Sequence, residues 1–239
     1  MNELSVIARV RTDFPSKFGL PRQSGLVPGL EGLVVFEKAF RNPDALRGIE
    51  GYSHLWLLWG FSQAFASGAG NGAWSPTVRP PRLGGNTRVG VFATRSPNRP
   101  NPIGLSAVRL LGVENDPKLG ATLRISGIDM ADNTPVYDIK PYLPLSDCIP
   151  DALGGFSDAV KNDSLQVVID EALLEKIPEN RRGALRSLLA ADPRPAYLVD
   201  GGREYGFPWA GYEISFCVSD GTLTVTGIEK RNEFRQETG

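Results

Sequence analysis

The sequence predicts a mainly β protein, in which a β-sandwich or barrel is followed by a smaller α+β domain. The first 145 residues contain short runs of alternating or apolar residues separated by turn residues, with almost no helical periodicity. The rest of the chain holds one clear helical pattern among strand-like runs. A chain of 239 residues is long enough for two unequal domains, which we expect at residues 1–155 and 160–239.

Seven segments of the first domain have the pattern of β-strands. SVIARVRTDF alternates apolar and polar residues, and GLVVFEKAF follows the breaker pair Pro28-Gly29. HLWLLWGF is a continuous apolar run typical of a strand buried on both faces, so we expect its Trp56 and Trp59 in the core. TRVGVFAT places Val89, Val91 and Ala93 on one face of a strand. The expected strands span residues 5–14, 32–40, 54–61, 87–94, 105–113, 121–129 and 134–143.

The second domain follows a small, polar segment, residues 151–163, that is typical of a linker. ENRRGALRSLLAAD predicts a helix because alanine and leucine recur in it at helical spacing, and Asp192-Pro193 ends it. Asp220-Gly221 is a strong hairpin signal that leads into a last strand. Further strands are expected at residues 164–170, 195–200 and 212–218.

The composition restricts the function classes. The formal net charge is −1, so a nucleic-acid contact would need a local arginine cluster. No run of 18 apolar residues and no secretory signal pattern occurs, so we expect no membrane span. Cys148 and Cys217, the only cysteines, indicate neither a disulfide framework nor a zinc site. We therefore expect a cytoplasmic protein without a bound metal.

Two motifs invite a functional interpretation that their context does not favour. GAGNGA, residues 68–73, matches the dinucleotide pattern G-x-G-x-x-A, but that pattern needs a following helix and an acidic residue about 20 positions later. Here Trp74-Ser75-Pro76 follows and position 93 is alanine, so we interpret the segment as a loop. His54, the only histidine, lies in an apolar run, which favours a packed residue over a general base.

Two stiff loops rich in proline and arginine flank the segment 87–94. RPPRLGGN carries Arg79 and Arg82, and RSPNRPNPIG carries Arg95 and Arg99. Proline reduces the entropy that a loop loses on binding, and arginine offers forked donors to phosphate or carboxylate. One loop of this kind is usually only solvated, but two beside the same element indicate polar groups held still beside a cavity.

Two further segments carry polar groups between turn residues. DMADNTPVYDIKPYLP, residues 129–144, holds three aspartates, which either cap turns or bind the ammonium, hydroxyl or base edge of a cofactor. PRQSG, residues 21–25, exposes Arg22 and Gln23, and is a weak signal on its own.

These segments together resemble one family. PRQSGL, GYSHLWLLW, RPPRLGGNTRVGVFATRSPNRPNPIGLS and DNTPVYDIKPYLP are similar, in this order, to the TsaA-like proteins and more closely to the bacterial TrmO family. DPRPAY is similar to the small C-terminal domain of that family. The resemblance implies a single-sheeted β-barrel, S-adenosylmethionine as cofactor, a homodimer, and methylation of the exocyclic amino nitrogen of threonylcarbamoyladenosine at position 37 of tRNA.

The resemblance also implies site residues. Cofactor contacts would fall on Arg22, Gln23, Ser24, Ser62, Gln63, Arg95, Leu105, Asp129, Met130, Ala131 and Asp132. Close relatives tend to have histidine where this chain has Ser62, which leaves the role of that position open. We expect Arg79, Arg82, Arg99 and Asn101 to bind the substrate, and Arg95, Asp129 and Asp132 are candidates for a catalytic role. Which group accepts the departing proton stays open.

The expected reaction depends on positioning and electrostatics, because the methyl donor is already activated. We hypothesise that the two arginine loops orient the modified base and neutralise its threonyl carboxylate. Candidates for anticodon-loop contacts are Arg79, Arg82 and Arg99 and, on the helix of the second domain, Arg181, Arg182 and Arg186. The spacing of the three helix arginines opposite the leucines is more typical of a solvated face. The rival hypotheses are a non-catalytic RNA-binding barrel and a methyltransferase of the same fold that acts on a small molecule.

Overall fold

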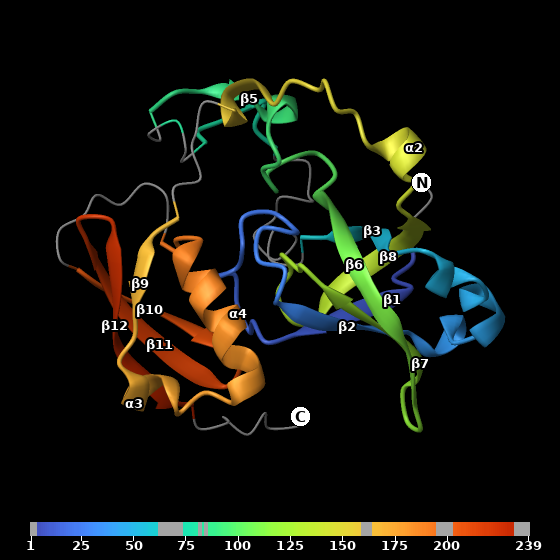
Figure 1. The fold of residues 1–239 in the computed structure, drawn as a ribbon. Helices are drawn as coiled ribbons and strands as arrows, with labels where there is room; N and C mark the ends of the chain where they lie inside the picture. The colour runs from blue at the N-terminus through green and yellow to red at the C-terminus, as the bar shows by residue number, and fades with distance from the viewer. Residues whose placement is uncertain are drawn as a thin grey trace, which may run out of the picture.

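The computed structural model describes residues 4–61, 74–80, 83, 86–158, 164–194 and 203–231. It consists of a closed β-barrel and a second, four-stranded sheet covered by a helix (Figure 1). The two parts share one continuous hydrophobic core. The predicted mainly β architecture, with a barrel first and a smaller α+β unit second, is therefore confirmed.

Six antiparallel strands form the barrel. They are β1 (Ala8–Thr12), β2 (Glu31–Phe36), β3 (His54–Gly60), β6 (Ile103–Asp116), β7 (Gly120–Ser126) and β8 (Thr134–Pro141). Their order around the barrel is β1-β2-β7-β6-β3-β8. The alternating residues of each strand point inward, and Val10, Leu57 and Val108 are fully buried there. Three short 3-10 helices, η1 (Lys38–Phe40), η2 (Pro43–Leu46) and η3 (Ile49–Gly51), connect β2 to β3.

The apolar run of β3 is explained by a cover on the outer side of the barrel. Leu55, Leu57 and Trp59 point into the barrel, whereas His54 and Trp56 are only half-buried on the outside. Trp56 Nε1 donates a hydrogen bond of 2.8 Å to Asp147 Oδ2, and its ring packs 5.5 Å from that of Tyr142. The expected burial of both tryptophans is thus correct only for Trp59.

The strand expected at residues 87–94 is wrong for most of its length. Only β5 (Val89–Gly90) pairs, with β4 (Thr77–Val78), and a 3-10 helix, η5 (Val91–Ala93), follows. Pro76 and Pro80 confine β4 to two residues, because proline has no amide donor for a ladder. With no partner left, the chain turns: Val91 is buried while Phe92 is 71% exposed. The C-terminal part of 32–40 is likewise helical, as η1.

The second sheet has the order β10-β11-β12-β9. Its elements are β9 (Gln166–Val168), α3 (Glu171–Leu174), α4 (Glu179–Ala190), β10 (Glu204–Trp209), β11 (Tyr212–Ser219) and β12 (Thr222–Lys230). The predicted helix and hairpin are confirmed: α4 buries its leucines, and Asp220 and Gly221 have φ of 49° and 74°, as a tight hairpin requires. The strand expected at 195–200 lies outside the described residues.

The loop from residue 13 to residue 30 fastens the barrel to the second unit. Asp13 forms an ion pair with Arg181 of α4, and its carbonyl accepts a 2.9 Å hydrogen bond from the Ala210 amide. Gly19 has φ +80°, and a Cβ there would collide with the ring of Phe207. These contacts fix the base of the segment that carries the PRQSG sequence.

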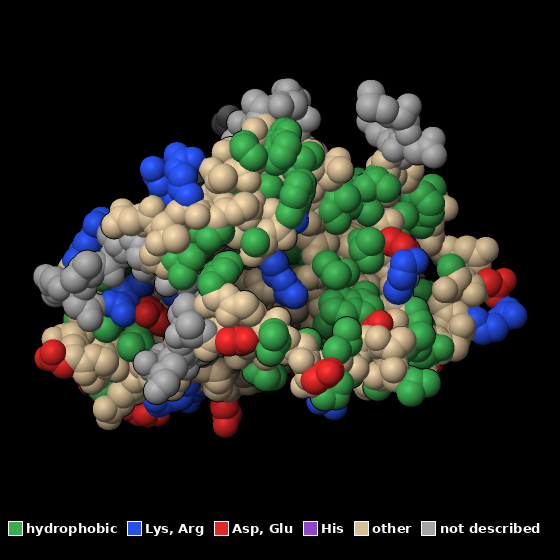
Figure 2. Space-filling model, turned by 90° about the horizontal axis from the view of Figure 1, so that it is seen from above, with side chains coloured by type: hydrophobic (Ala, Val, Ile, Leu, Met, Phe, Trp, Pro, Cys, Tyr) green, Lys and Arg blue, Asp and Glu red, His purple; other side chains and the backbone are tan. Residues whose placement is uncertain are grey.

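A long arm follows the barrel. It contains α2 (Pro144–Asp147) and η6 (Gly155–Ser157) and runs along the upper side of the molecule in Figure 1. Its apolar side chains have almost no cover: Leu145, Ile149 and Leu153 are 100%, 64% and 94% exposed. Seen from this side, hydrophobic side chains occupy much of the surface (Figure 2). None of the helices in the described part of the chain is long and apolar enough to span a membrane.

Candidate functional site

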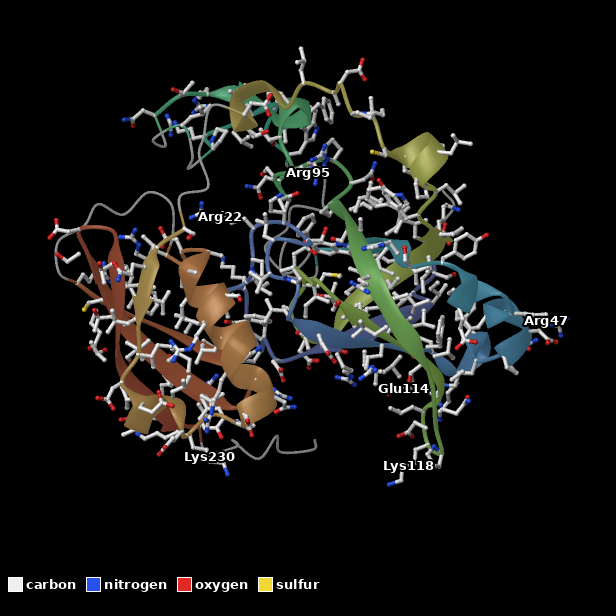
Figure 3. The ribbon with its side chains drawn as sticks, in the orientation of Figure 1. Arg22, Arg47, Arg95, Glu114, Lys118 and Lys230 are labelled. Carbon is white, nitrogen blue, oxygen red and sulfur yellow. The ribbon has the colours of Figure 1, made fainter. Side chains whose placement is uncertain are left out.

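Three segments meet at one end of the barrel. The Arg95 guanidinium donates a hydrogen bond to Gln23 Oε1, and the Gly25 amide donates one of 2.9 Å to the carbonyl of Gly127. The carboxylate of Asp129 accepts a hydrogen bond from the Ser24 amide and feels the charge of Arg95. Figure 3 shows Arg22 and Arg95 at the same end of the barrel, opposite the end that carries Lys118. The structure thus joins the PRQSG segment, the RSPNRPNPIG segment and the first aspartate of DMADN.

The RSPNRPNPIG loop is held rigid by its own side chains. Thr94 Oγ1 donates to the carbonyl of Val91 at 2.8 Å and accepts from the Ser96 amide at 3.2 Å. Arg99 Nη1 donates to the carbonyls of Thr94 and Ser96 at 3.0 and 3.3 Å. Arg99, expected to bind the substrate, therefore shapes the loop from which Arg95 projects.

Asp129 is the ionisable group with the most unusual surroundings at this site. Burial raises the pKa of its carboxyl above the ordinary value, against the lowering effects of the Ser106 hydroxyl, the Ser24 amide and the Arg95 charge. Ser106 Oγ donates to Asp129 Oδ1 at 2.7 Å, and Trp59 Nε1 donates to Ser106 Oγ at 2.9 Å. A carboxylate held in this way is a good partner for a cation, a hydroxyl or a leaving proton.

The sequence prediction missed Ser106 and assigned Trp59 only to the core. A signal was present, because Ser106 occupies an inward position of the alternating strand LSAVRLL. A hydroxyl inside an apolar barrel is costly unless it has a hydrogen-bond partner. Such a residue therefore indicates a nearby polar group.

The rest of the DMADN segment is turned toward β1 rather than toward Arg95. Asp132 Oδ1 accepts from the Thr12 amide at 3.0 Å, and Asp132 Oδ2 lies 3.5 Å from Arg11 Nη1. Met130 is buried, and its carbonyl accepts from Thr12 Oγ1 at 3.2 Å. These contacts fasten the segment to the barrel, and they leave Asp129 as the catalytic candidate that faces the other two loops. Ala131, between Met130 and Asp132 in the chain, is half-buried.

Arg22 points toward the second unit and borders a cavity of about 570 Å³ between the two parts of the chain. Arg22 Nη2 lies 3.5 Å from the carbonyl of Arg194, whose guanidinium pairs with Asp192 at 2.8 and 2.9 Å. Although burial would raise the pKa of Asp192, its hydrogen bonds and the charges of Arg194 and Arg22 lower it. The DPR part of DPRPAY therefore reaches the PRQSG segment through Arg22.

The other predicted site residues fall into three groups. Arg79, Asn101 and Arg186 are exposed, as is Leu105, which is on the outer face of β6. Arg181 pairs with Asp13, and Arg182 donates to the carbonyl of Ile177, so both serve the fold. Ser62, Gln63 and Arg82 lie outside the described residues. Among the residues that are described, no three His, Cys, Asp or Glu side chains gather as metal ligands would.

Two models of known protein domains match most of the chain. Residues 9–148 match the tRNA-methyltransferase O N-terminal domain, and residues 162–231 match the TrmO C-terminal domain. The chain belongs to the TrmO family. A crystal structure of TrmO from Pseudomonas aeruginosa superposes on it with a TM-score of 0.77, at 33% identity over 96% of this chain and 97% of that one. The resemblance noted in the sequence motifs is thereby confirmed.

Curated relatives of this TrmO family member include enzymes of known name. It is 40% identical over 233 residues to the tRNA (adenine(37)-N6)-methyltransferase of Escherichia coli (strain K12), covering 94% of this chain and 97% of the relative. It is 41% identical over 178 residues to the enzyme of that name in Eikenella corrodens, covering 74% of this chain and 97% of the relative. A Pseudomonas aeruginosa protein, 41% identical over 214 residues, is named "Putative S-adenosylmethionine-dependent methyltransferase RcsF"; there the match covers 86% of this chain and 87% of the relative.

Proposed function

We propose that this protein uses S-adenosylmethionine to methylate the exocyclic amino nitrogen of threonylcarbamoyladenosine at position 37 of tRNA. The observation that carries the proposal is the meeting of Gln23, Arg95 and Asp129 at the mouth of a barrel whose relatives are named tRNA (adenine(37)-N6)-methyltransferases. The domain limits that go with it are 1–155 for the catalytic barrel and 160–239 for the smaller domain.

The charges at the barrel mouth suit a zwitterionic cofactor. Asp129 offers a partly buried carboxylate to a cation or a hydroxyl, and Arg95 offers a guanidinium to a carboxylate. The two groups lie close enough for the charge of Arg95 to act on Asp129. Gln23 and Ser24 supply an amide side chain and a backbone segment between them. We assign these four residues to the cofactor.

The protein's contribution to the reaction is to orient the reactants and to stabilise charge. The bound cofactor supplies a methyl group on a sulfonium, which is already activated toward a nucleophile. Rigid loops around Arg95 hold the reacting groups in line without losing entropy at that step. We assign to Asp129, ionised above its raised pKa, the role of accepting the proton that the amino nitrogen loses.

We assign substrate recognition to two exposed arginines, one in each unit. Arg79 is exposed on the segment that leads away from β4, and we propose that it pairs with the threonyl carboxylate. Arg186 is exposed on α4 and is suited to a tRNA phosphate. Unstacked anticodon-loop bases provide the rest of the contact surface. The site of action is the cytoplasm, in agreement with two free cysteines, Cys148 and Cys217.

Thermal unfolding separates this enzyme from a plain RNA clamp. At 100 times its Kd, a ligand that binds only the folded state stabilises it by about 2.7 kcal/mol, which raises Tm by about 5–10 °C for a protein of this size. We expect S-adenosylmethionine to produce this shift in the absence of RNA. No shift would favour the non-catalytic barrel. Transfer of labelled methyl to the free nucleoside at the same rate as to whole tRNA would favour the small-molecule enzyme.

We also propose that the exposed arm docks on a second copy of this chain. Burying a leucine side chain contributes about 1.5–3 kcal/mol, and the arm leaves Leu145 and Leu153 almost fully in solvent. Leu105, on the outer face of β6, is 52% exposed and adds to the apolar surface of the barrel. A homodimer would bring these surfaces out of water beside the candidate site.

The arm can be tested by introducing charge. We expect the double variant Leu145→Asp, Leu153→Asp to sediment as a monomer, while the native chain sediments as a dimer, because a buried carboxylate without a partner is strongly unfavourable. Val168→Asp, at an exposed apolar position on β9 of the second unit, is the matched control and should leave the dimer intact. Dimers that persist in the double variant would exclude the arm from the interface.

A further inference from the structure

We infer that Trp59 and Ser106 are positioning residues for the reaction, which hold the Asp129 carboxylate through a buried hydrogen-bond relay. The inference rests on the proposed function and deepens it, since it names two residues that act on the site without touching the substrate. The relay runs from Trp59 Nε1 to Ser106 Oγ over 2.9 Å and from Ser106 Oγ to Asp129 Oδ1 over 2.7 Å. It links the interior of the barrel to its mouth.

The direction of the relay is set by the chemistry of its members. An indole N–H can only donate, so Ser106 Oγ must accept from Trp59. The single hydroxyl hydrogen of Ser106 is then left for Asp129, which accepts it at a distance typical of a hydrogen bond to a carboxylate. Trp59 therefore orients the serine hydroxyl, and the serine orients the carboxylate.

The donor end of the relay is held in place by packing. Trp59 pairs with Gly104 across β3 and β6, and a Cβ on Gly104 would collide with the indole ring. The ring of Phe61 also packs against the indole, with a distance of 4.4 Å between the ring centroids. These contacts leave the buried indole little room to rotate, which keeps its N–H directed at Ser106.

Burying the hydroxyl of Ser106 costs free energy that an apolar residue at this position would not cost. Ser106 is fully buried among apolar side chains, and alanine would fill the same position without a polar atom to satisfy. The hydrogen bonds with Trp59 and Asp129 offset the cost of removing this hydroxyl from water. Of the charged groups in the described part of the chain, Arg95 acts on Asp129, while Arg11 faces Asp132 instead. Ser106 is thus the buried neutral donor that complements Arg95.

The relay has a consequence for the pH dependence of ligand binding. The Ser106 hydrogen bond lowers the pKa of Asp129, in opposition to the burial that raises it. Without the hydroxyl, the pKa of Asp129 rises further. Ligand binding that needs the ionised carboxylate is lost as pH falls through this pKa, so its acid limb moves to higher pH.

The test is calorimetric titration of the full-length protein with S-adenosylhomocysteine and with S-adenosylmethionine across a pH series. We expect Ser106→Ala to weaken S-adenosylmethionine binding about tenfold at neutral pH, as the loss of a hydrogen bond to a charged group does, and to shift its acid limb upward. Trp59→Phe, which keeps an aromatic ring of smaller size and removes the N–H donor, should weaken S-adenosylmethionine binding about threefold. The double variant should bind as Ser106→Ala does, because Trp59 acts only through the serine.

Controls distinguish the relay from general damage to the barrel. Thr122→Val removes another buried hydroxyl, which donates to the Glu114 carbonyl at 3.3 Å, and should alter neither affinity nor pH profile. Ser106→Thr keeps the hydroxyl and should recover most of the affinity. Unchanged affinity and an unmoved acid limb in both Ser106→Ala and Trp59→Phe would overturn the relay alone. Failure of the native protein to bind either ligand would overturn the relay and the proposed function together.

Discussion

Replacement of Asp129 by asparagine is expected to weaken S-adenosylmethionine binding by about 100-fold and to remove most methyl transfer. The change keeps the size of the side chain and one acceptor oxygen, but it removes the negative charge. In the native protein the raised pKa of Asp129 means that affinity falls as pH drops through that pKa. In the variant this acid limb should disappear. Calorimetry for binding and labelled-methyl transfer for activity measure both effects.

The same variant should not be less stable than the native protein at neutral pH. A carboxyl whose folded pKa is raised above its unfolded pKa makes the folded state favour the protonated form, so ionisation at neutral pH costs stability. Asparagine resembles the protonated form and avoids this cost. Asp132→Asn provides the contrast: it weakens the contacts with Thr12 and Arg11 and should lower Tm. A large fall in Tm for Asp129→Asn would show that Asp129 serves the fold instead of the ligand.

Discrimination between modified and unmodified tRNA is the second large effect. We expect transcripts that carry threonylcarbamoyladenosine at position 37 to be methylated at least about 100-fold faster than transcripts with plain adenosine. Arg79 is exposed in the free protein, but a bound anticodon loop would cover its guanidinium, and the donors covered in this way stay unsatisfied when the carboxylate is missing. Initial rates with labelled S-adenosylmethionine on the two transcripts give the ratio directly.

Arg79 is the described arginine on which this ratio should depend. Arg79→Ala should lower the rate on the modified transcript and leave the small rate on the unmodified one nearly unchanged. Arg79→Lys keeps the charge but not the forked geometry, and should give an intermediate ratio. Arg186→Ala removes an exposed guanidinium on α4 and should weaken the binding of both transcripts equally. Equal rates on the two transcripts in the native protein would end the carboxylate-pairing hypothesis.

The barrel was predictable because each of its strands repeats the local signals of a strand. Alternation in β1 and β6, and turn residues between the runs, agree with the tertiary structure. The segment 87–94 misled because its alternation is as good as that of a real strand. Pairing depends on a partner, however, and the partner β4 is cut short by prolines. The prolines that limit the pairing lie next to β4, so the alternation of residues 87–94 does not show them.

The part of the candidate site that the sequence predicts is the proline-rich loop that carries an arginine. The partners of each side chain depend on the folded arrangement and could not be predicted. Prolines around Arg95 indicated a fixed loop, and the loop does join Gln23. The sequence does not show that Arg99 and Arg182 donate hydrogen bonds to the carbonyls of Thr94 and Ile177, because folding brings these acceptors into reach. Ser106 escaped notice because it lies within an apolar strand, and its hydrogen-bond partners Trp59 and Asp129 are 47 and 23 positions away in the chain.

The most direct test of the central claim is mass spectrometry of the nucleosides in tRNA from cells that lack this gene. The proposed function predicts that threonylcarbamoyladenosine accumulates without its methyl group. The native gene should restore the methylated nucleoside, and a gene that encodes Asp129→Asn should not. Methylated threonylcarbamoyladenosine at its normal level in the deletion strain would contradict the assignment.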